Sequence, residues 1–386
     1  MALRQLRLEC CSLPYSNDGT TEGLAAALSL LAAGLEHLSL KELATRGDGT
    51  VEFPTGVLQH LQQLTYLELA HIWVLGPDQD QPALQPLHAL TCLVDLRLIG
   101  VGAAGSQEEG SEITASMLAC MHNLTSLQLS FDLEVEPGAL AGKTNCKLQH
   151  LELYHCNVPG GRAGWSDFLS HLQQLQQLTH LTVSQHLTDR WITAPPAYSA
   201  LTASSKLQHL DISFTELPAG AWQHTFPVGR QLPYLQYLDS TAAERFAPAP
   251  DFSRTVSCCP GLQQLKLLLT PRCKAQLLAP LQGLTALHTL HVGGNEITAD
   301  ATQPLGQLTG LKELNVITFG SIRAELLLPL TELQQLTTLH LHGRVNNLYQ
   351  VAKLTSKVGG NTVYTFPCCL LCGTGCFLML KAPGWL

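Results

Sequence analysis

The stretch LQHLELYHCNV, residues 148–158, has leucine at its first, fourth and sixth positions, cysteine at its ninth and valine at its eleventh. A half-buried strand alternates apolar and polar residues, and an amphipathic helix places its apolar residues three or four apart. The stretch follows neither rule over its whole length. Its spacing therefore needs another explanation, and the rest of the chain supplies one.

The same spacing recurs along most of the sequence, with starts about 24 to 32 residues apart. Clear copies begin at Leu64, Leu93, Leu124, Leu178, Leu207, Leu262, Leu287, Leu311 and Leu336, and weaker copies at Leu3, Leu35 and Leu235. The pattern resembles that of leucine-rich-repeat proteins, LxxLxLxx(N/C)xL, from Leu3 to about Leu341. The resemblance implies an α/β solenoid, a horseshoe with a concave parallel β-sheet and a helical or irregular convex side.

Physical chemistry fits this expectation. Counting from the first leucine, the fourth and sixth residues of a repeat point into the core, and the third, fifth, seventh and eighth point outward. One coil cannot bury its leucines alone, so neighbouring coils must stack. The ninth residue, such as Cys156 or Thr215, is expected to pack inside the turn.

Two domains are predicted from the extent of the pattern. Residues 1–345 form a solenoid of about 13 repeats, and residues 346–386 form a cap segment followed by an apolar, cysteine-rich tail. The segments between repeat strands are expected to be helical, with Pro54 as a first helical residue and Ser166 as an N-cap. Residues 101–116, which include Glu112, are interpreted as a polar connection on the rim. Repeats of about 28 residues resemble the intracellular ribonuclease-inhibitor type, and the shorter repeats of about 24 to 25 residues from Leu262 onward resemble other subtypes, so the subtype is mixed.

Composition limits the functional classes. The net charge is −8 and no run of lysine or arginine occurs, so nucleic acid is not expected as a partner and a basic partner is favoured. The N-terminal residues lack an apolar stretch of signal-peptide length. Thirteen cysteines, an odd number, are interpreted as reduced thiols. We therefore expect a cytoplasmic location, with the cytoskeleton or ciliary axoneme as the alternative that the resemblance implies.

The C-terminal tail carries four cysteines, Cys368, Cys369, Cys372 and Cys376. Three interpretations stay open for it: a packed tail, membrane attachment through acylated cysteines, or a thiolate metal site. The CxxC spacing suits zinc, but no second half-site follows. The apolar stretch is also shorter than the roughly 20 residues of a spanning helix. No cofactor and no metal is expected elsewhere.

The outward strand positions in the middle of the chain concentrate histidines, aromatic residues and carboxylates. The candidate partner-binding residues are His150, Glu152, Tyr154, His155, His180, His209, Asp211, Phe214, Tyr237 and Asp239. Three interpretations are open: a recognition face for a protein, an incidental polar surface, or a metal or catalytic constellation. We expect the first, because an open sheet lacks the water-excluding pocket that catalysis needs.

No catalytic motif accompanies the repeats. The chain contains no GxxxxGK[ST], HExxH or GxSxG sequence. The family resemblance implies a non-enzymatic scaffold that binds a protein partner on the concave face. Two alternatives remain open at this point. One is a regulator of an enzyme, such as a small-GTPase activator or a ribonuclease inhibitor, and the other is a membrane-attached receptor fragment.

Overall fold

The computed structural model divides the chain into two compact units, Met1–Thr193 and Ala194–Leu386. Each unit is described below by itself. The residues that the structure describes are 3–13, 22–45, 52–76, 82–103, 111–131, 133–141, 147–184, 194–215, 217–241, 252–269, 278–294, 302–322, 324–345, 364–367 and 377–380.

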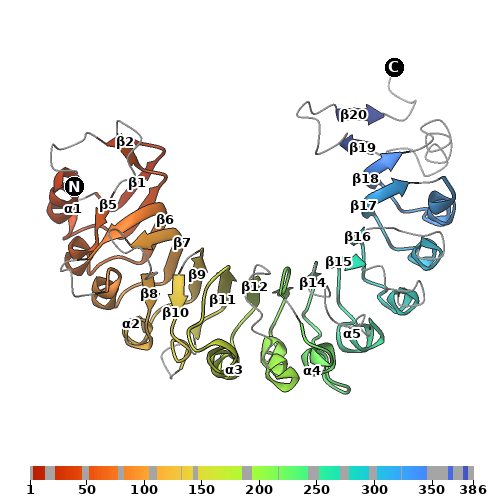
Figure 1. Ribbon diagram of the computed structural model, residues 1–386, viewed down its shortest axis with the longest axis horizontal. Coiled ribbons are helices and arrows are strands. Elements are labelled where there is room, and N and C mark those ends of the chain that lie inside the picture. Colours follow the sequence, from red (N-terminus) through yellow and green to blue (C-terminus); the bar gives the residue numbers. More distant parts are fainter. Residues whose placement is uncertain are drawn as a thin grey trace. The chain divides into compact units, whose positions relative to one another are not determined.

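The first unit contains a parallel sheet with one strand per repeat (Figure 1). In spatial order its strands are β1 (Gln5–Glu9), β3 (His37–Lys41), β6 (Tyr66–Leu75), β7 (Asp95–Ala103), β9 (Ser126–Ser130), β11 (His150–Tyr154) and β12 (His180–Ser184). The register follows the repeat, because Leu151 of β11 pairs with Leu127 of β9 and with Leu181 of β12. Spatial order therefore equals sequence order, as expected when each coil stacks on the one before it.

The second unit repeats this arrangement. Its parallel strands are β13 (His209–Asp211), β14 (Tyr237–Ser240), β15 (Gln264–Leu269), β16 (Thr289–Gly294), β17 (Glu313–Ile322) and β18 (Thr338–Val345). Leu290 of β16 pairs with Leu265 on one side and Leu314 on the other. A separate antiparallel pair, β19 (Tyr364–Pro367) and β20 (Phe377–Leu380), lies near the end of the chain. The leucine-rich-repeat solenoid predicted from the sequence is confirmed in both units.

The repeat leucines form the core. Leu151 is fully buried and Leu153 is 2% exposed, whereas the alternating residues of β11, His150, Glu152 and Tyr154, are half-buried. Burying each leucine side chain stabilises the fold by about 2 kcal/mol. Phe168, Leu169 and Leu172 close the core from the other side, on helix α3 (Gly161–Leu172). Each coil thus contributes two strand leucines and an apolar outer segment.

The outer segments are shorter than the sequence suggested. Two helices in the described residues exceed eight residues, α1 (Glu22–Leu31) and α3. The other helical segments are η1 (Thr55–His60), η2 (Gln85–Ala89), α2 (Ala115–Cys120), η4 (Pro195–Thr202), α4 (Ala221–Thr225), α5 (Phe252–Cys258), η6 (Ala279–Gly283), η7 (Pro304–Gln307), η8 (Ala324–Leu327) and η9 (Pro329–Glu332). Many are single 3₁₀ turns with proline in the first turn, where its missing N–H costs no hydrogen bond.

Two predicted helix starts were wrong, that of α3 by six residues and that of η1 by one residue. Helix α3 begins earlier than expected, with Gly160 in the left-handed conformation as its N-cap, and Ser166 lies inside the helix. Pro54 ends the short strand β5 (Glu52–Pro54) and caps η1 rather than occupying its first position. In both cases a turn residue before the apolar pattern decides where the helix begins, which periodicity alone does not reveal.

Short strands also form beside the main sheet of the first unit. β5 pairs with the end of β6, and β8 (Ser111–Ile113) pairs with β10 (Leu133–Val135). β2 (Ser12–Leu13) pairs with β4 (Ala44–Thr45) in the same way. The interpretation of residues 101–116 as a rim connection is therefore wrong in part, because β7 extends to Ala103 and β8 follows.

Two backbone features recur from coil to coil. At repeat position two, each amide donates to the position-two carbonyl of the preceding coil, with N···O distances of 2.8–2.9 Å in the first unit. The residues joined in this way are Glu36, Thr65, Val94, Thr125, Gln149 and Thr179. At position eight the backbone turns left-handed, with φ from 48° to 59° at Cys10, Glu42, His71, Phe131, His155 and Phe214.

Several sequence predictions fall on residues outside the described ranges. Cys368, Cys369, Cys372 and Cys376 are among them, and so are residues 346–361 of the predicted cap segment. The two-domain division at residue 345 also stays a prediction. Within the described ranges, none of the helices has the length and apolar character needed to cross a bilayer.

Candidate functional site

The first part of the predicted site lies on β11 and β12 of the first unit. His150 and His180 pair in register, and their rings stack with centroids 5.0 Å apart. His150 Nε2 lies 2.6 Å from Glu152 Oε1, within hydrogen-bond distance. Burial lowers the pKa of His180, and His150 lowers it further, while Glu152 acts in the opposite direction. The structure therefore brings these three residues together and holds the two rings in different charge environments.

Tyr154 and His155 follow at the end of β11. The His155 amide donates to Ser184 O at 2.8 Å, and its left-handed backbone turns the side chain toward Phe131. The two rings are 5.1 Å apart at 34°. Phe131 remains 45% exposed. A left-handed conformation costs a non-glycine residue about 1–2 kcal/mol, so the turn imposes a cost on these aromatic residues that glycine would avoid.

The second part of the predicted site lies in the second unit, around Tyr237. His209 stacks on its ring with centroids 4.0 Å apart and planes 4° apart. Lys266 Nζ lies 5.3 Å from the ring centroid, a cation–π distance. The Tyr237 hydroxyl donates to Asp239 Oδ2 at 3.1 Å, and Lys266 Nζ is 3.5 Å from the same oxygen. The ring is thus held by a histidine, a cation and a carboxylate.

The two aspartates of this region have local structural partners. Asp211 Oδ1 accepts a hydrogen bond from the Ser213 amide at 2.8 Å, and Asp239 Oδ1 accepts one from the Thr241 amide at 2.9 Å. Burial raises the pKa of Asp211, although the Ser213 contacts oppose the shift. Phe214 follows with φ 59° and is 42% exposed. The aspartates therefore accept hydrogen bonds from backbone amides just after their strands, while Phe214 presents apolar surface to solvent.

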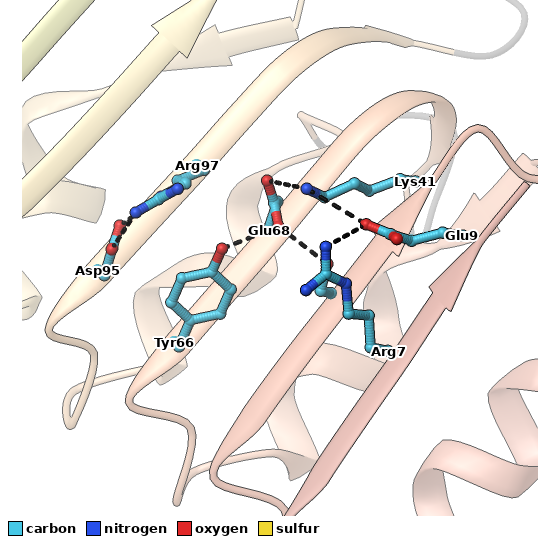
Figure 2. Close-up of polar contacts among 8 residues, drawn as sticks. Arg7, Glu9, Lys41, Tyr66, Glu68, Asp95 and Arg97 are labelled. Atoms are coloured by element: carbon cyan, nitrogen blue, oxygen red, sulfur yellow. Dashed lines mark hydrogen bonds and ion pairs between the residues drawn. The ribbon is translucent and has the colours of Figure 1, made fainter.

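Sequence reasoning missed a charge network at the start of the first unit (Figure 2). Its centre is Glu68, whose side chain is 5% exposed. Glu68 Oε2 accepts hydrogen bonds from the Ser39 hydroxyl at 2.9 Å and from the Tyr66 hydroxyl at 2.8 Å. Lys41 Nζ lies 2.9 Å from Glu68 Oε1. A carboxylate this deeply buried is stable only with such partners.

The network extends on both sides of Glu68. Lys41 also reaches Glu9 Oε1 at 3.4 Å, and Arg7 donates to the same oxygen at 2.6 Å. On β7, Arg97 donates to both carboxylate oxygens of Asp95, at 3.2 and 2.9 Å. Figure 2 shows these groups crossing four neighbouring strands. Cations and carboxylates alternate, so the network is close to electroneutral.

The charge states of this network follow from its geometry. Burial by itself raises the pKa of Glu68, but hydrogen bonds from Lys41, Tyr66 and Ser39 outweigh it, so the pKa lies below its ordinary value of 4.5. Burial and Glu68 both raise the pKa of Tyr66. The signal was available in the sequence, because all these residues stand at repeat positions three, five and seven. Aligning those positions across the first four repeats would have found it.

The arrangement around Tyr66 matches the one around Tyr237. His37 stacks on Tyr66 with centroids 3.9 Å apart and planes 5° apart, and the Arg97 guanidinium lies 5.3 Å from the ring centroid. In both units the histidine comes from the preceding strand, the carboxylate from the same strand and the cation from the following strand. The solenoid therefore builds the same ring platform twice.

Metal binding finds no support on this face. Within the described ranges, no group of three or more His, Cys, Asp or Glu side chains is placed to hold a metal ion. His340 and His342 stack at 6.4 Å, and burial lowers the pKa of His291 and of His342. Burial therefore favours the neutral forms of His291 and His342.

Comparison with known proteins found likenesses among solved structures alone, since no family model and no curated protein matches the chain. One is the plant peptide hormone receptor RGFR1 in complex with RGF2, at 14% identity and a TM-score of 0.48, covering 94% of this chain and 51% of the receptor. Another is the leucine-rich-repeat ectodomain of the receptor kinase GASSHO1/SCHENGEN3 from Arabidopsis thaliana in complex with CASPARIAN STRIP INTEGRITY FACTOR 2, at 14% identity and a TM-score of 0.48, covering 95% and 50%.

A third likeness, PEPR1-AtPEP1, has 16% identity and a TM-score of 0.45, covering 87% of this chain and 42% of that chain. The chain thus spans about half the length of the first two structures, or less for the third. With every TM-score below 0.5, these likenesses say nothing about what this chain binds. The leucine-rich-repeat solenoid follows from the chain's own parallel strands and buried leucines.

Proposed function

We propose that the chain is a non-enzymatic interaction module that binds a protein or peptide partner on the outward face of its parallel strands. One observation carries the proposal: aromatic rings at repeat position three are stacked in pairs on adjacent strands. The pairs are His37–Tyr66, His150–His180 and His209–Tyr237. Rings fixed before a partner arrives lose little side-chain entropy on binding, so these pairs are suited to be contact points.

The surroundings of the rings support the same function. One face of each sheet covers the leucine core, and the other carries rings, carboxylates and cations. Tyrosine is enriched where binding energy concentrates in interfaces. The exposed Phe131 and Phe214 add apolar area beside the polar groups. A mixed surface of this kind resembles the composition of protein interfaces, which combine an aromatic centre with a polar rim.

The non-enzymatic part of the proposal rests on the state of the carboxylates. Glu68 is held ionised by three donors, and Asp239 accepts hydrogen bonds from Tyr237 and from the Thr241 amide. A general base needs a free lone pair aimed at a substrate proton. Groups engaged in this way are better suited to fixing neighbouring side chains.

A second part of the proposal concerns the cellular location and the repeat subtype. We propose a cytoplasmic location and a repeat subtype like that of intracellular ribonuclease inhibitors, on the strength of the odd number of cysteines and the repeats of about 28 residues. Fractionation of cells that express the tagged chain checks the location. Recovery in a secreted or membrane fraction contradicts it.

The test of the interaction face compares two variants of the full chain. In the first, His150, Glu152, His180 and His209 are replaced by alanine. In the control, four exposed glutamines of the outer segments are replaced: Gln62, Gln174, Gln223 and Gln307. Partners captured from cells are quantified by mass spectrometry. We expect the sheet variant to lose bound proteins that the wild type and the control retain.

Two further controls sharpen this comparison. Circular dichroism and thermal unfolding confirm that both variants are folded. A photo-crosslinking residue at Gln128, which is on the sheet face, should form partner adducts, and the same residue at Gln62 should not. If the two positions crosslink equally, or if the sheet variant keeps every partner, the outward face is not the binding surface.

A further inference from the structure

A second strip of outward side chains lies at the flank of the first unit, beyond the ends of the main strands. β6 continues past its left-handed residue, and Trp73 pairs in register with Glu52 of β5 and Gly102 of β7. Burial alternates along this extension: Ile72 and Val74 are 1% and 0% exposed, whereas Trp73 is 42% exposed. A large aromatic side chain therefore stands on the water side of a short parallel ladder.

The ladder is shaped to hold this tryptophan. A Cβ atom at Gly102 would lie 2.9 Å from Trp73 Cζ3 and 3.0 Å from Cε3. The indole thus lies across the Gly102 backbone, where only glycine leaves room. One side of the indole therefore lies against β7, while Trp73 stays 42% exposed. Tryptophan is one of the residue types enriched at the energetic centres of interfaces.

Acidic side chains occupy the neighbouring short strands. Glu112 of β8 pairs directly with Glu134 of β10, and the Asn157 side chain donates a hydrogen bond from Nδ2 to Glu134 Oε1 at 2.9 Å. Glu136 Oε2 accepts a hydrogen bond from the Ala115 amide at 2.6 Å. β7 packs against both β8 and β10. The flank strip, defined by Glu52, Trp73, Gly102, Glu112 and Glu134, therefore combines one aromatic residue with several carboxylates.

In the part of the chain that the structure describes, Glu112, Glu134 and Glu136 form no ion pair. Burial raises the pKa of Glu112, and the charges of Glu136 and Glu134 raise it further. The main sheet differs sharply, because there Lys41 and Arg97 neutralise their neighbours. The flank strip therefore carries negative charge that a partner can neutralise.

We propose that the flank strip docks a basic segment of a partner protein, with an arginine guanidinium on the Trp73 indole and a second cation between Glu112 and Glu134. Charge complementarity selects this occupant. A second copy of the chain, with its net charge of −8, and a nucleic acid would both bring like charges to the strip. Arginine is favoured over lysine because its planar group stacks on aromatic rings and pairs bidentately with carboxylates.

The test uses the full chain and three fluorescein-labelled octapeptides, Arg-Gly, Lys-Gly and Glu-Gly repeated four times. Binding is measured by fluorescence anisotropy at low ionic strength. Trp73→Ala and the pair Glu112→Gln with Glu134→Gln alter the strip. Tyr234→Ala, at a residue 59% exposed in the second unit, and Glu332→Gln, at an exposed glutamate, are the matched controls.

We expect the arginine peptide to bind most tightly and the acidic peptide not at all. Trp73→Ala and the double glutamine variant should each weaken binding about tenfold, equivalent to about 1.4 kcal/mol. Trp73→Phe, which keeps a ring, should retain more affinity than Trp73→Ala, and the two controls should bind as the wild type does. Absence of saturable binding, or an equal loss in the controls, overturns the proposal.

This surface is independent of the sheet face proposed above. The variant with alanine at His150, Glu152, His180 and His209 should bind the arginine peptide unchanged. A loss of peptide binding in that variant would show that the peptide occupies the sheet face and would refute the assignment to the strip. Failure of the peptide assay leaves the capture experiment on the sheet face unaffected, so the two proposals fail separately.

Discussion

Replacing Glu68 by glutamine tests whether the buried charge network stabilises the first unit. The glutamine amide oxygen can accept from Ser39 and Tyr66 as Glu68 Oε2 does, but its NH₂ group then faces the Lys41 ammonium, donor against donor. Hydrogen bonds to charged groups contribute about 1.5–3 kcal/mol, whereas exposed ion pairs contribute at most about 1 kcal/mol. With side chains 5% and 29% exposed, we expect a loss of about 2 kcal/mol.

A double-mutant cycle isolates the interaction between Glu68 and Lys41. Lys41→Met leaves the carboxylate buried with neutral donors alone, so it should also destabilise the region. The variant Lys41→Met with Glu68→Gln should be less unstable than the sum predicts, with a coupling energy of about 1–2 kcal/mol. Hydrogen exchange of the amides in β3 and β6 is the suitable assay, because coils of a solenoid open locally.

The pH dependence gives an independent check. The folded pKa of Glu68 lies below its ordinary value of 4.5, so its contribution is complete above pH 4.5 and is lost as the pH falls through the folded value. Wild-type protection of β6 should therefore decline more steeply below pH 4.5 than that of Glu68→Gln. A coupling energy under about 0.3 kcal/mol, or identical pH slopes in the two proteins, refutes the reasoning.

Two further predictions concern the histidine pair and the close approach at helix α3. Because burial and His150 hold the pKa of His180 below 6.5, wild-type stability should decrease as the pH falls from 6.5 through the folded value. His180→Gln should flatten this decrease in thermal unfolding between pH 7.5 and 5.5, and an unchanged slope contradicts the assignment. Gly164→Ala brings a Cβ atom against the Pro159 carbonyl oxygen inside van der Waals contact, whereas Gly138→Ala meets nothing within 4 Å. Overpacking typically costs about 1–3 kcal/mol, so Gly164→Ala should lower the urea midpoint and Gly138→Ala should not; equal midpoints contradict the clash.

The sequence predicts the strands well and their surroundings poorly, for a physical reason. Burial requires apolar side chains at positions one, four and six, so the strand around Leu151 and Leu153 is predicted by the repeat spacing of the sequence. Helix α3 begins at Gly161 instead of near Ser166 because backbone geometry at Gly160, not apolar spacing, decides it. The strand β8 was read as a connection because its three residues carry too short a pattern.

The candidate site was likewise predicted only in part from the sequence. His150 and His180 both stand at repeat position three, so the repeat spacing alone predicts that they are neighbours. The network around Glu68 occupies repeat positions three, five and seven, and the contact between Lys41 and Glu68 is recognised only when neighbouring repeats are aligned in register, because it runs diagonally between two strands. Charge and ring contacts of this kind depend on how far each side chain reaches, and the sequence alone does not give that distance.

The row of backbone hydrogen bonds at repeat position two, here called the rail, allows whole coils to be inserted or removed. Every carbonyl on the rail meets an amide of the same kind, so excising residues 149–178 would set the Thr179 amide opposite Thr125 O, where the Gln149 amide now donates. A deletion of one such unit therefore leaves each remaining position-two amide opposite a carbonyl of the same repeat position. The number of coils can therefore change while each remaining coil keeps its own side chains. A long surface can be lengthened or shortened in this way without substitutions in the other coils.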